Sequence, residues 1–237
     1  MQAPHRISNI WATMDTDKGD LIDRSEAYAR WTVPAIMPPE GMEGQEQSKG
    51  NVPTGARLVN HLANRIVEVL FPISRPFFTV ALTPEAKLEL EQELGEEQSG
   101  MMQEAVRDST SRLEGVAIRK LRLTEYRPTA ITAAKHLIVT GNVLLRRMPD
   151  GKRVIYVNRY GVRRDILGVE REVILPEKKR FSTFDEATKA SIREVHPKVK
   201  DEDDMELFTL YEKKDKRWKI TQEADGVPLD TESYQNE

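Results

Sequence analysis

The sequence predicts an α+β fold in which a mostly helical region precedes a β-rich one. Across the first two thirds of the 237 residues, apolar side chains recur mainly at helical spacing. In the last third they lie in short extended runs separated by turn residues. Because helices and strands are segregated along the chain, we expect an α+β arrangement rather than alternating β and α units.

One helix and one linker are predicted before residue 54. Residues 15–33 carry acidic side chains near their start, which suits the positive end of a helix dipole, and Pro34 ends this helix. Residues 38–53 are rich in Pro, Gly, Gln and Glu and have no apolar period, so we expect a flexible linker.

A clearly amphipathic helix is predicted from Thr54, a suitable N-cap, to Leu70, where Phe71-Pro72 stops it. Five apolar positions recur on one side of this helix, and we expect this side to face the core. They are Leu58, Leu62, Ile66, Val69 and Leu70.

The next elements are an extended run and three helices. Residues 77–82 are typical of a strand. Helices are predicted at 84–94 and 101–121, with a break at Gly95 to Gly100 between them. A further helix begins near Pro128, which is tolerated in a first helical turn.

The remaining elements are mainly β. Gly141-Asn142 ends the last helix, and Asp150-Gly151 is a turn that joins strands at 143–147 and 154–157 as a hairpin. The other predicted elements are an extended pair at 162–175, a short helix at 184–195 and a hairpin of 205–212 with 217–222.

The formal net charge of −3 conceals strong segregation of charge along the chain. There are one basic and seven acidic residues over 84–104, fourteen basic and four acidic over 105–164, and five basic and twelve acidic over 201–237. Such blocks indicate complementary surfaces, either between identical chains or toward a charged partner. Solvated helix faces remain the simpler interpretation of any single block.

Composition and motifs exclude several classes of function. The absence of cysteine excludes disulfides, thiolate chemistry and cysteine-based zinc sites. The sequence has neither a P-loop nor a G-x-S-x-G motif, and we expect no enzyme and no cofactor. No apolar run approaches the ~20 residues of a membrane span, and the N-terminus lacks the apolar core of a secretion signal.

Two groups of residues are candidates for binding a metal ion. None of the histidines has a neighbour at metal-ligand spacing; they are His5, His61, His136 and His196. We expect His61 and His136 to be ordinary surface or boundary residues. The run Asp201 to Asp204 could hold two metal ions as in a nuclease, but consecutive side chains point in different directions, so a solvated loop is favoured.

Basic residues are concentrated between Arg107 and Arg164, so contact with phosphates is one interpretation. Few aromatic residues lie among them, which argues against a stacking platform for single strands. Salt bridges to an acidic neighbour are the favoured interpretation.

Four segments, taken in order, carry a family resemblance. They are residues 26–38 (EAYARWTVPAIMP), residues 55–72 from Gly55-Ala56-Arg57 to Leu70-Phe71-Pro72, residues 126–145 from Tyr126-Arg127 to Gly141-Asn142-Val143-Leu144-Leu145, and residues 160–168 around Arg164-Asp165. Together they resemble the portal protein, or head-to-tail connector, of short-tailed bacteriophages with the T7-like body plan. The motif residues that the resemblance assigns to building the fold are Tyr28, Pro34, Gly55, Ala56, Arg57, Asn60, Leu62, Phe71, Pro72, Gly141, Asn142 and Asp165.

The resemblance implies a structural ring, commonly of twelve copies, at the portal vertex of the virion capsid, assembled in the host bacterial cytoplasm. Double-stranded DNA would pass through the ring during packaging and ejection. The implied partners are the terminase, tail adaptor and nozzle proteins, and internal core or scaffolding proteins, with no membrane. Candidates for the subunit interface or for proximity to DNA are Arg57, Arg146, Arg147, Arg163 and Arg164, and we favour ring contacts for the last four.

The resemblance also divides the chain. Residues 1–53 correspond to an N-terminal helix and linker, 54–147 to the helical part of a portal wing, and 148–237 to its β-rich part. The family's stem, clip, channel loop and crown have no counterpart here. We therefore expect a truncated portal, a broken prophage gene, or one of two polypeptides that form a portal. The alternative function is a phage-derived interaction or DNA-binding module that keeps the wing fold without a channel.

Overall fold

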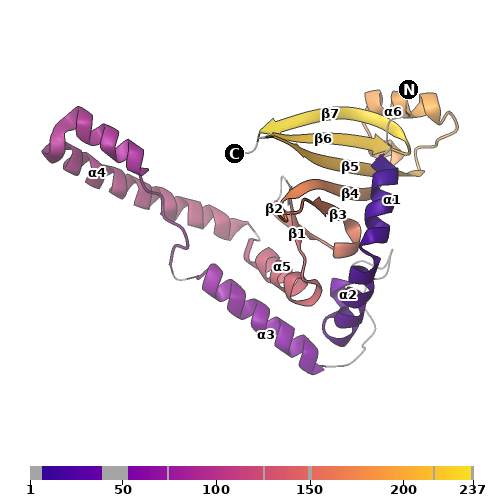
Figure 1. Cartoon of the computed structure of the whole chain (residues 1–237), viewed down its shortest axis with the longest axis horizontal. Helices are drawn as coiled ribbons and strands as arrows, with labels where there is room; N and C mark the ends of the chain where they lie inside the picture. Colours follow the sequence, from indigo (N-terminus) through magenta and orange to yellow (C-terminus); the bar gives the residue numbers. More distant parts are fainter. Residues whose placement is uncertain are drawn as a thin grey trace. The chain divides into compact units, whose positions relative to one another are not determined.

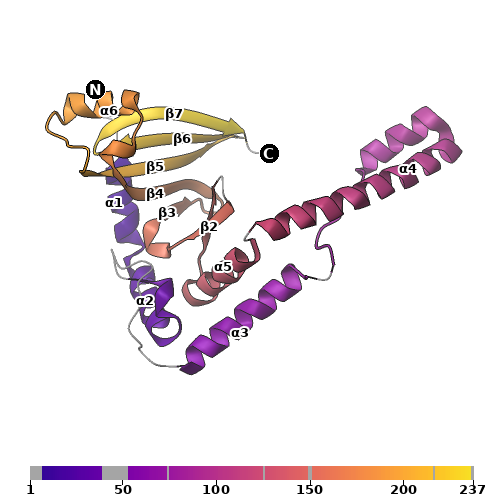
Figure 2. The same cartoon turned by 180° about the vertical axis from the view of Figure 1, so that it is seen from behind.

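The computed structural model describes residues 7–38, 53–73, 75–124, 126–148, 151–215 and 217–235. It confirms the α+β class, because helices dominate the first part of the chain and antiparallel strands the last (Figures 1 and 2). The chain forms two compact units. The sheet unit takes the described residues of 1–52, 139–144 and 155–237, and the helical unit those of 53–138 and 145–154.

A five-stranded antiparallel meander, in the order β3-β4-β5-β6-β7, forms the centre of the sheet unit. Its strands are β3 (Gly161–Arg164), β4 (Glu170–Arg180), β5 (Asp204–Lys214), β6 (Arg217–Ala224) and β7 (Val227–Gln235). The extended pair and the hairpin predicted in this region are confirmed. Strand β7 was not predicted, although Asp225-Gly226, both with positive φ, forms a tight turn of a kind that typically joins two strands.

Three helices and three short 3-10 turns accompany the sheet. They are α1 (Ile7–Asp17), α2 (Gly19–Trp31), η1 (Pro34–Ile36), η2 (Val157–Arg159), η3 (Phe181–Thr183) and α6 (Glu186–Val195). The helix predicted at 15–33 is confirmed as α2, although it begins later than expected, whereas the separate helix α1 was not predicted. The spacing of Ile7, Ile10, Trp11 and Met14 is helical, and these are the residues that α1 turns toward the sheet.

The core of the sheet unit consists of two clusters. Ile7 and Met14 of α1 pack against Ile174, Phe208 and Leu210 of the sheet. The second cluster lies where α6 and η3 meet the strands, and its buried members are Phe181, Phe184, Ile192, Met205, Leu207, Ala224 and Val227. These two clusters hold the N-terminal helix and α6 on the same meander.

The helical unit contains α3 (Pro53–Leu70), α4 (Pro84–Leu123), most of α5 (Tyr126–Thr140) and the hairpin of β1 (Leu144–Met148) with β2 (Gly151–Ile155). The predicted 143–157 hairpin is thereby confirmed. The run at 77–82, expected as a strand, is an irregular segment instead. The predicted linker at 38–53 lies almost entirely outside the described residues.

The face that α3 buries is not the one predicted. Ala63 and Val67 pack against Ala134 of α5, whereas Leu58, Leu62, Val69 and Leu70 are exposed. The buried side of α3 is therefore the one that carries Ala63 and Val67, which pack against α5. The larger apolar residues of α3 are left on the surface of the chain.

Helical structure continues through Gly95 to Gly100, where a break was predicted, but α4 reverses direction there. The side-chain amide of Gln103 donates a 3.4 Å hydrogen bond to Oε1 of Glu91. Twelve residues along a straight helix would separate these positions by about 18 Å. The helix therefore doubles back as a hairpin, as Figure 1 shows. We call the shorter part of α4 before Gly95 the first limb and the longer part after Gly100 the second limb.

Candidate functional site

The motif residue Asp165 organises the tight turn between β3 and β4. Its Oδ1 accepts hydrogen bonds of 2.9 Å from the backbone N–H groups of both Leu167 and Val169, and its Oδ2 lies 2.8 Å from Nη2 of Arg171. The N–H of Val169, with further help from Arg171, holds the pKa of Asp165 below its usual value. Gly168 completes the turn with φ +82°. The contacts of Asp165 thus stabilise the conformation of this turn.

Arg163 and Arg164 face acidic partners on the neighbouring strand. Arg163 Nη1 lies 2.8 Å from Glu172 Oε2, and Arg164 Nη1 lies 3.0 Å from Glu170 Oε1. These residues are paired in the β3–β4 register, with an irregularity between the two arginines. Both guanidinium groups remain about half exposed, so each can also contact a second molecule.

The other arginine candidates lie in the helical unit. Arg57 is exposed on the first turns of α3, and Arg147 is exposed on β1. Arg146, the preceding residue of β1, is half-buried, because successive side chains of a strand point to opposite faces. The five candidates are therefore spread over β1, β3 and α3, and two of them, Arg163 and Arg164, lie beside carboxylates.

Two of the recognised motifs meet at the end of α3. Arg127 Nη1 donates a 2.7 Å hydrogen bond to the carbonyl oxygen of Phe71, and the ring of Phe71 packs edge-on against Tyr126 at 6.0 Å between centroids. Phe77 also contacts Phe71, at 5.1 Å. The Leu-Phe-Pro stop of α3 and the Tyr-Arg start of α5 are therefore one junction, which explains why both belong to the resemblance.

The remaining motif residues mostly shape the backbone. Pro34 opens η1, and Gly141 ends α5 with φ +72°. The backbone N–H of Asn142 lies 3.3 Å from the hydroxyl of Thr140, which in turn donates to the carbonyl of Asn142. Tyr28 and Leu62 are exposed, whereas Gly55, Ala56, Asn60 and Pro72 are half-buried.

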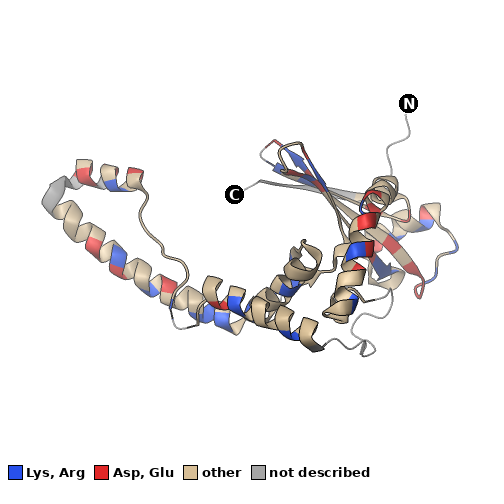
Figure 3. Ribbon diagram, turned by 60° about the horizontal axis from the view of Figure 1, so that its bottom comes forward, with Lys and Arg blue, Asp and Glu red and all other residues tan. Residues whose placement is uncertain are grey.

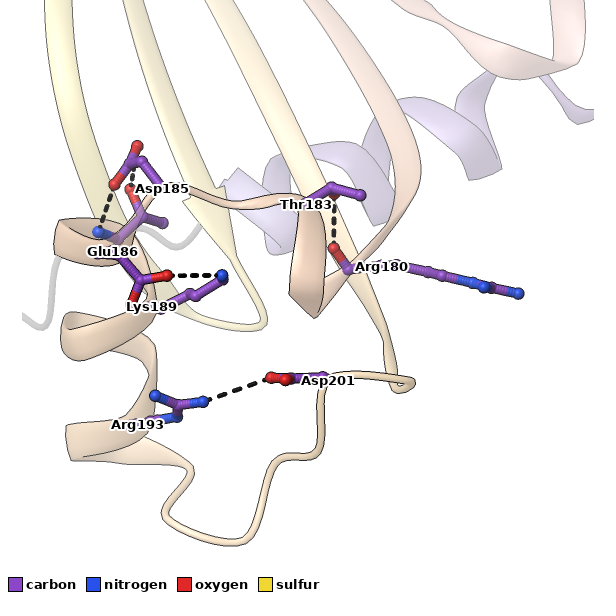
Figure 4. A network of polar contacts seen from close by, with 8 residues as sticks. Arg180, Thr183, Asp185, Glu186, Lys189, Arg193 and Asp201 are labelled. Atoms are coloured by element: carbon purple, nitrogen blue, oxygen red, sulfur yellow. Dashed lines mark hydrogen bonds and ion pairs between the residues drawn. The ribbon is translucent and has the colours of Figure 1, made fainter.

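The acidic run Asp201 to Asp204 forms the turn that leads into β5, and its polar contacts tie it to neighbouring segments. Asp201 Oδ1 lies 3.4 Å from Arg193 of α6, and Oδ2 of Asp203 accepts a 2.8 Å hydrogen bond from the backbone N–H of Lys200 (Figure 4 shows the first of these). Among the described residues, no three His, Asp or Glu side chains gather closely enough to hold a metal ion.

Helix α6 contacts this turn through Arg193 of its last turn, and its start is capped by its own sequence. Asp185 accepts a 2.7 Å hydrogen bond from the backbone N–H of Thr188, which lowers the pKa of this carboxyl group (Figure 4). Glu186 pairs with Lys189 at 2.8 Å, and this contact lowers the pKa of Glu186. Thus the polar network around α6 stabilises a helix.

His136 is a core residue, contrary to the prediction of a surface or boundary position. Only 3% of it is exposed, and burial lowers its pKa to about 4. His61 is exposed, as expected, and Nε2 of His196 lies 3.1 Å from the carbonyl oxygen of Asp225. His5 lies outside the described residues. Helix α5 presents His136 inward among alanines, and this inward orientation is not visible in its spacing alone.

Comparison with known proteins identifies the class to which this fold belongs. Residues 4–234 match the sequence profile of the family described as bacteriophage head to tail connecting protein. The chain belongs to this family.

Three relatives are portal proteins of bacteriophages. The chain is 33% identical over 233 residues to the portal protein of Enterobacteria phage SP6, an alignment that covers 96% of this chain and 44% of the relative. It is 28% identical over 200 residues to the portal protein of Pseudomonas phage phiKMV, an alignment that covers 83% of this chain and 38% of the relative. It is 22% identical over 208 residues to the portal protein of Escherichia phage T7, an alignment that covers 85% of this chain and 38% of the relative. The chain therefore spans less than half the length of the relatives it matches.

No helix in the described ranges combines the length and apolar character needed to cross a lipid bilayer.

Proposed function

We propose that this chain is a structural component of a phage portal ring at the capsid vertex, in the virion, which forms part of the passage for packaging and ejecting double-stranded DNA. The observation that carries the proposal is the match along almost the whole chain to the connector family, together with 33% identity to a phage portal protein. In this role the chain acts by assembly and shape rather than by catalysis.

Within that ring the chain would supply the wing, with residues 54–147 as its helical part and 148–237 as its β-rich part. The ring would contain twelve copies, assembled in the host cytoplasm. It would dock the terminase, tail adaptor and nozzle proteins, and internal core or scaffolding proteins. The support for these finer points is the family membership.

The basic candidates would serve the subunit interface rather than DNA. Arg147, Arg163 and Arg164 are at least partly exposed, and Arg163 and Arg164 already lie beside carboxylates, a geometry that a second acidic surface can extend into a network. Rings of identical chains are built from heterologous contacts of this kind, between unlike surfaces, when the rotation between subunits closes. Arg146 is assigned to the same proposed interface because it lies next to Arg147 in β1.

Electron microscopy and light scattering of the purified chain test the proposal. We expect closed rings with a central channel. A chain that stays monomeric at all concentrations, or that binds DNA as a monomer, would contradict it and favour an interaction or DNA-binding module that keeps the wing fold.

A further inference from the structure

Few of the side chains that the structure describes in the α4 hairpin are buried. Between Pro84 and Leu123, the described residues that are fully buried are Ser99 and Ile118. Helices in proteins owe most of their stability to packing of an apolar face rather than to propensity. A forty-residue helical element with so little core therefore needs a further surface against which to pack.

The second limb has an inner face that contacts its own chain. Glu114 Oε1 accepts a 2.6 Å hydrogen bond from the backbone N–H of Val80, and Ile118 is buried. A hollow of about 730 Å³ lies between this face, the segment 79–82 and Lys87 of the first limb. The positions 107, 110, 114 and 118 follow one side of the helix, so this side is already occupied.

The opposite side of the second limb carries an exposed apolar stripe. Met102, Val116 and Leu123 fall at multiples of seven residues, with Leu113 between them, which is the spacing of a helix that packs against another helix. Their exposed fractions are 46%, 43% and 87%, and that of Leu113 is 58%. Arg112, Arg119 and Lys120 flank the stripe, and none of them forms an ion pair within the described part of the chain. We call this surface the basic face.

The first limb has an acidic outer face. Glu85, Glu89 and Glu93 recur every four residues and are exposed, with exposed Leu88 beside them. Like charges at this spacing repel one another, and no basic residue that the structure describes pairs with them. Lys87 and Glu91 point the other way, toward the hollow and toward Gln103. Figure 3 shows the charged residues of the two limbs.

The two outer faces match each other in length and charge. Glu85 and Glu93 lie eight positions apart, as do Arg112 and Lys120, which corresponds to about 12 Å of helix. They lie on different limbs of one hairpin and face away from its interior, so they cannot cover each other within one chain. A contact between two unlike faces of identical subunits is heterologous, the kind of contact from which rings are built when the rotation between subunits closes.

We propose that the acidic face of α4 in one copy docks on the basic face of α4 in the next copy, so that the hairpins form a continuous band around the ring. This inference rests on the ring proposed above and identifies one of its contacts. The partner is a second copy of this chain, because the complementary charges and the apolar stripe are both present on the same hairpin.

Charge reversal tests the contact. The acid-to-lysine variant carries Glu85→Lys, Glu89→Lys and Glu93→Lys, and the base-to-glutamate variant carries Arg112→Glu, Arg119→Glu and Lys120→Glu. Each variant alone has two faces of the same sign, so we expect the protein concentration required for rings to rise about tenfold or more. Mixing the two variants in equal amounts should restore even-numbered rings of alternating subunits.

A matched control carries the same change of charge on α2, as Asp20→Lys, Asp23→Lys and Glu26→Lys, at exposed positions. It should assemble like the wild type, and circular dichroism checks that all variants remain folded. Rings that are unchanged in both α4 variants would overturn this contact, and would show that the hairpin binds another protein or none, while leaving the proposed ring intact. A wild-type chain that never forms rings would contradict both proposals.

Discussion

The backbone N–H of Ile7 donates a 2.8 Å hydrogen bond to Oε2 of Glu223, a residue 216 positions later in the sequence. Ile7 begins α1, where unpaired N–H groups and the helix dipole favour a negative charge. Glu223 belongs to β6 and is 5% exposed. A buried carboxylate of the sheet therefore caps the N-terminal helix, which joins the two ends of the sheet unit.

Replacing Glu223 with alanine should detach the start of α1 from the sheet. We expect the free energy of unfolding to fall by about 1–3 kcal/mol, the cost of leaving a buried donor unpaired. Urea denaturation followed by tryptophan fluorescence measures this, because Trp11 lies on α1. Glu194→Ala, at an exposed position on α6, serves as the control, and equal effects of the two substitutions would contradict the capping role.

Gly161 is required where α1 crosses the start of β3. A Cβ at this position would lie 2.9 Å from Sδ and 3.1 Å from Cβ of Met14. Gly161→Ala should therefore destabilise the chain by about 1–3 kcal/mol through overpacking. Gly161→Ala should cost less stability in a chain that already carries Met14→Ala than in the wild type. A double-mutant cycle of unfolding free energies measures this difference. Strictly additive effects would show that the two residues do not clash.

His136 should make the chain less stable in mild acid. Its pKa is about 4 when folded against 6.5 when unfolded, so the unfolded state takes up the proton first as the pH falls. The free energy of unfolding should decline by about 3 kcal/mol as the pH falls from 6.5 to about 4, and this contribution should level off once the pH is well below the folded pKa. The comparison is between the wild type and His136→Gln over this range. Parallel pH profiles would contradict the prediction.

Arg163 and Arg164 provide a test of the proposed ring contacts in the sheet unit. Arg163→Ala with Arg164→Ala should reduce ring formation, while the fold loses at most about 1 kcal/mol for each exposed ion pair. Glu170→Ala with Glu172→Ala breaks the same two ion pairs but keeps the arginines, and should preserve the rings. The fraction of chain in rings is counted by electron microscopy. Equal assembly of both double variants would exclude the arginines from the interface.

The elements that the sequence predicts well are those specified by local chemistry. Pro34 and Phe71-Pro72 end their helices, Gly141 stops α5, and Gly168 turns between β3 and β4. Each of these signals acts over a few residues, through a fixed φ, a missing N–H or a left-handed conformation. The same kind of local pattern explains why the motif segments could be matched to a family before their positions in space were known.

The candidate residues were less predictable because their roles depend on distant partners. The sequence marks Arg163 and Arg164 as basic, but only the register of β3 with β4 places Glu172 and Glu170 beside them. Likewise, the contact of Arg127 with the carbonyl of Phe71 joins residues 56 positions apart.

By itself, the sequence determined the α+β class, most helix ends and turns, and the connector family, because these depend on short-range patterns. Only the tertiary structure decided that α3 buries Ala63 and Val67 rather than its leucines, that His136 is internal, and that α4 doubles back with two charged faces outward. An amphipathic pattern predicts that one face of a helix will be covered. Whether the same chain covers that face depends on which other segments of the chain pack against the helix.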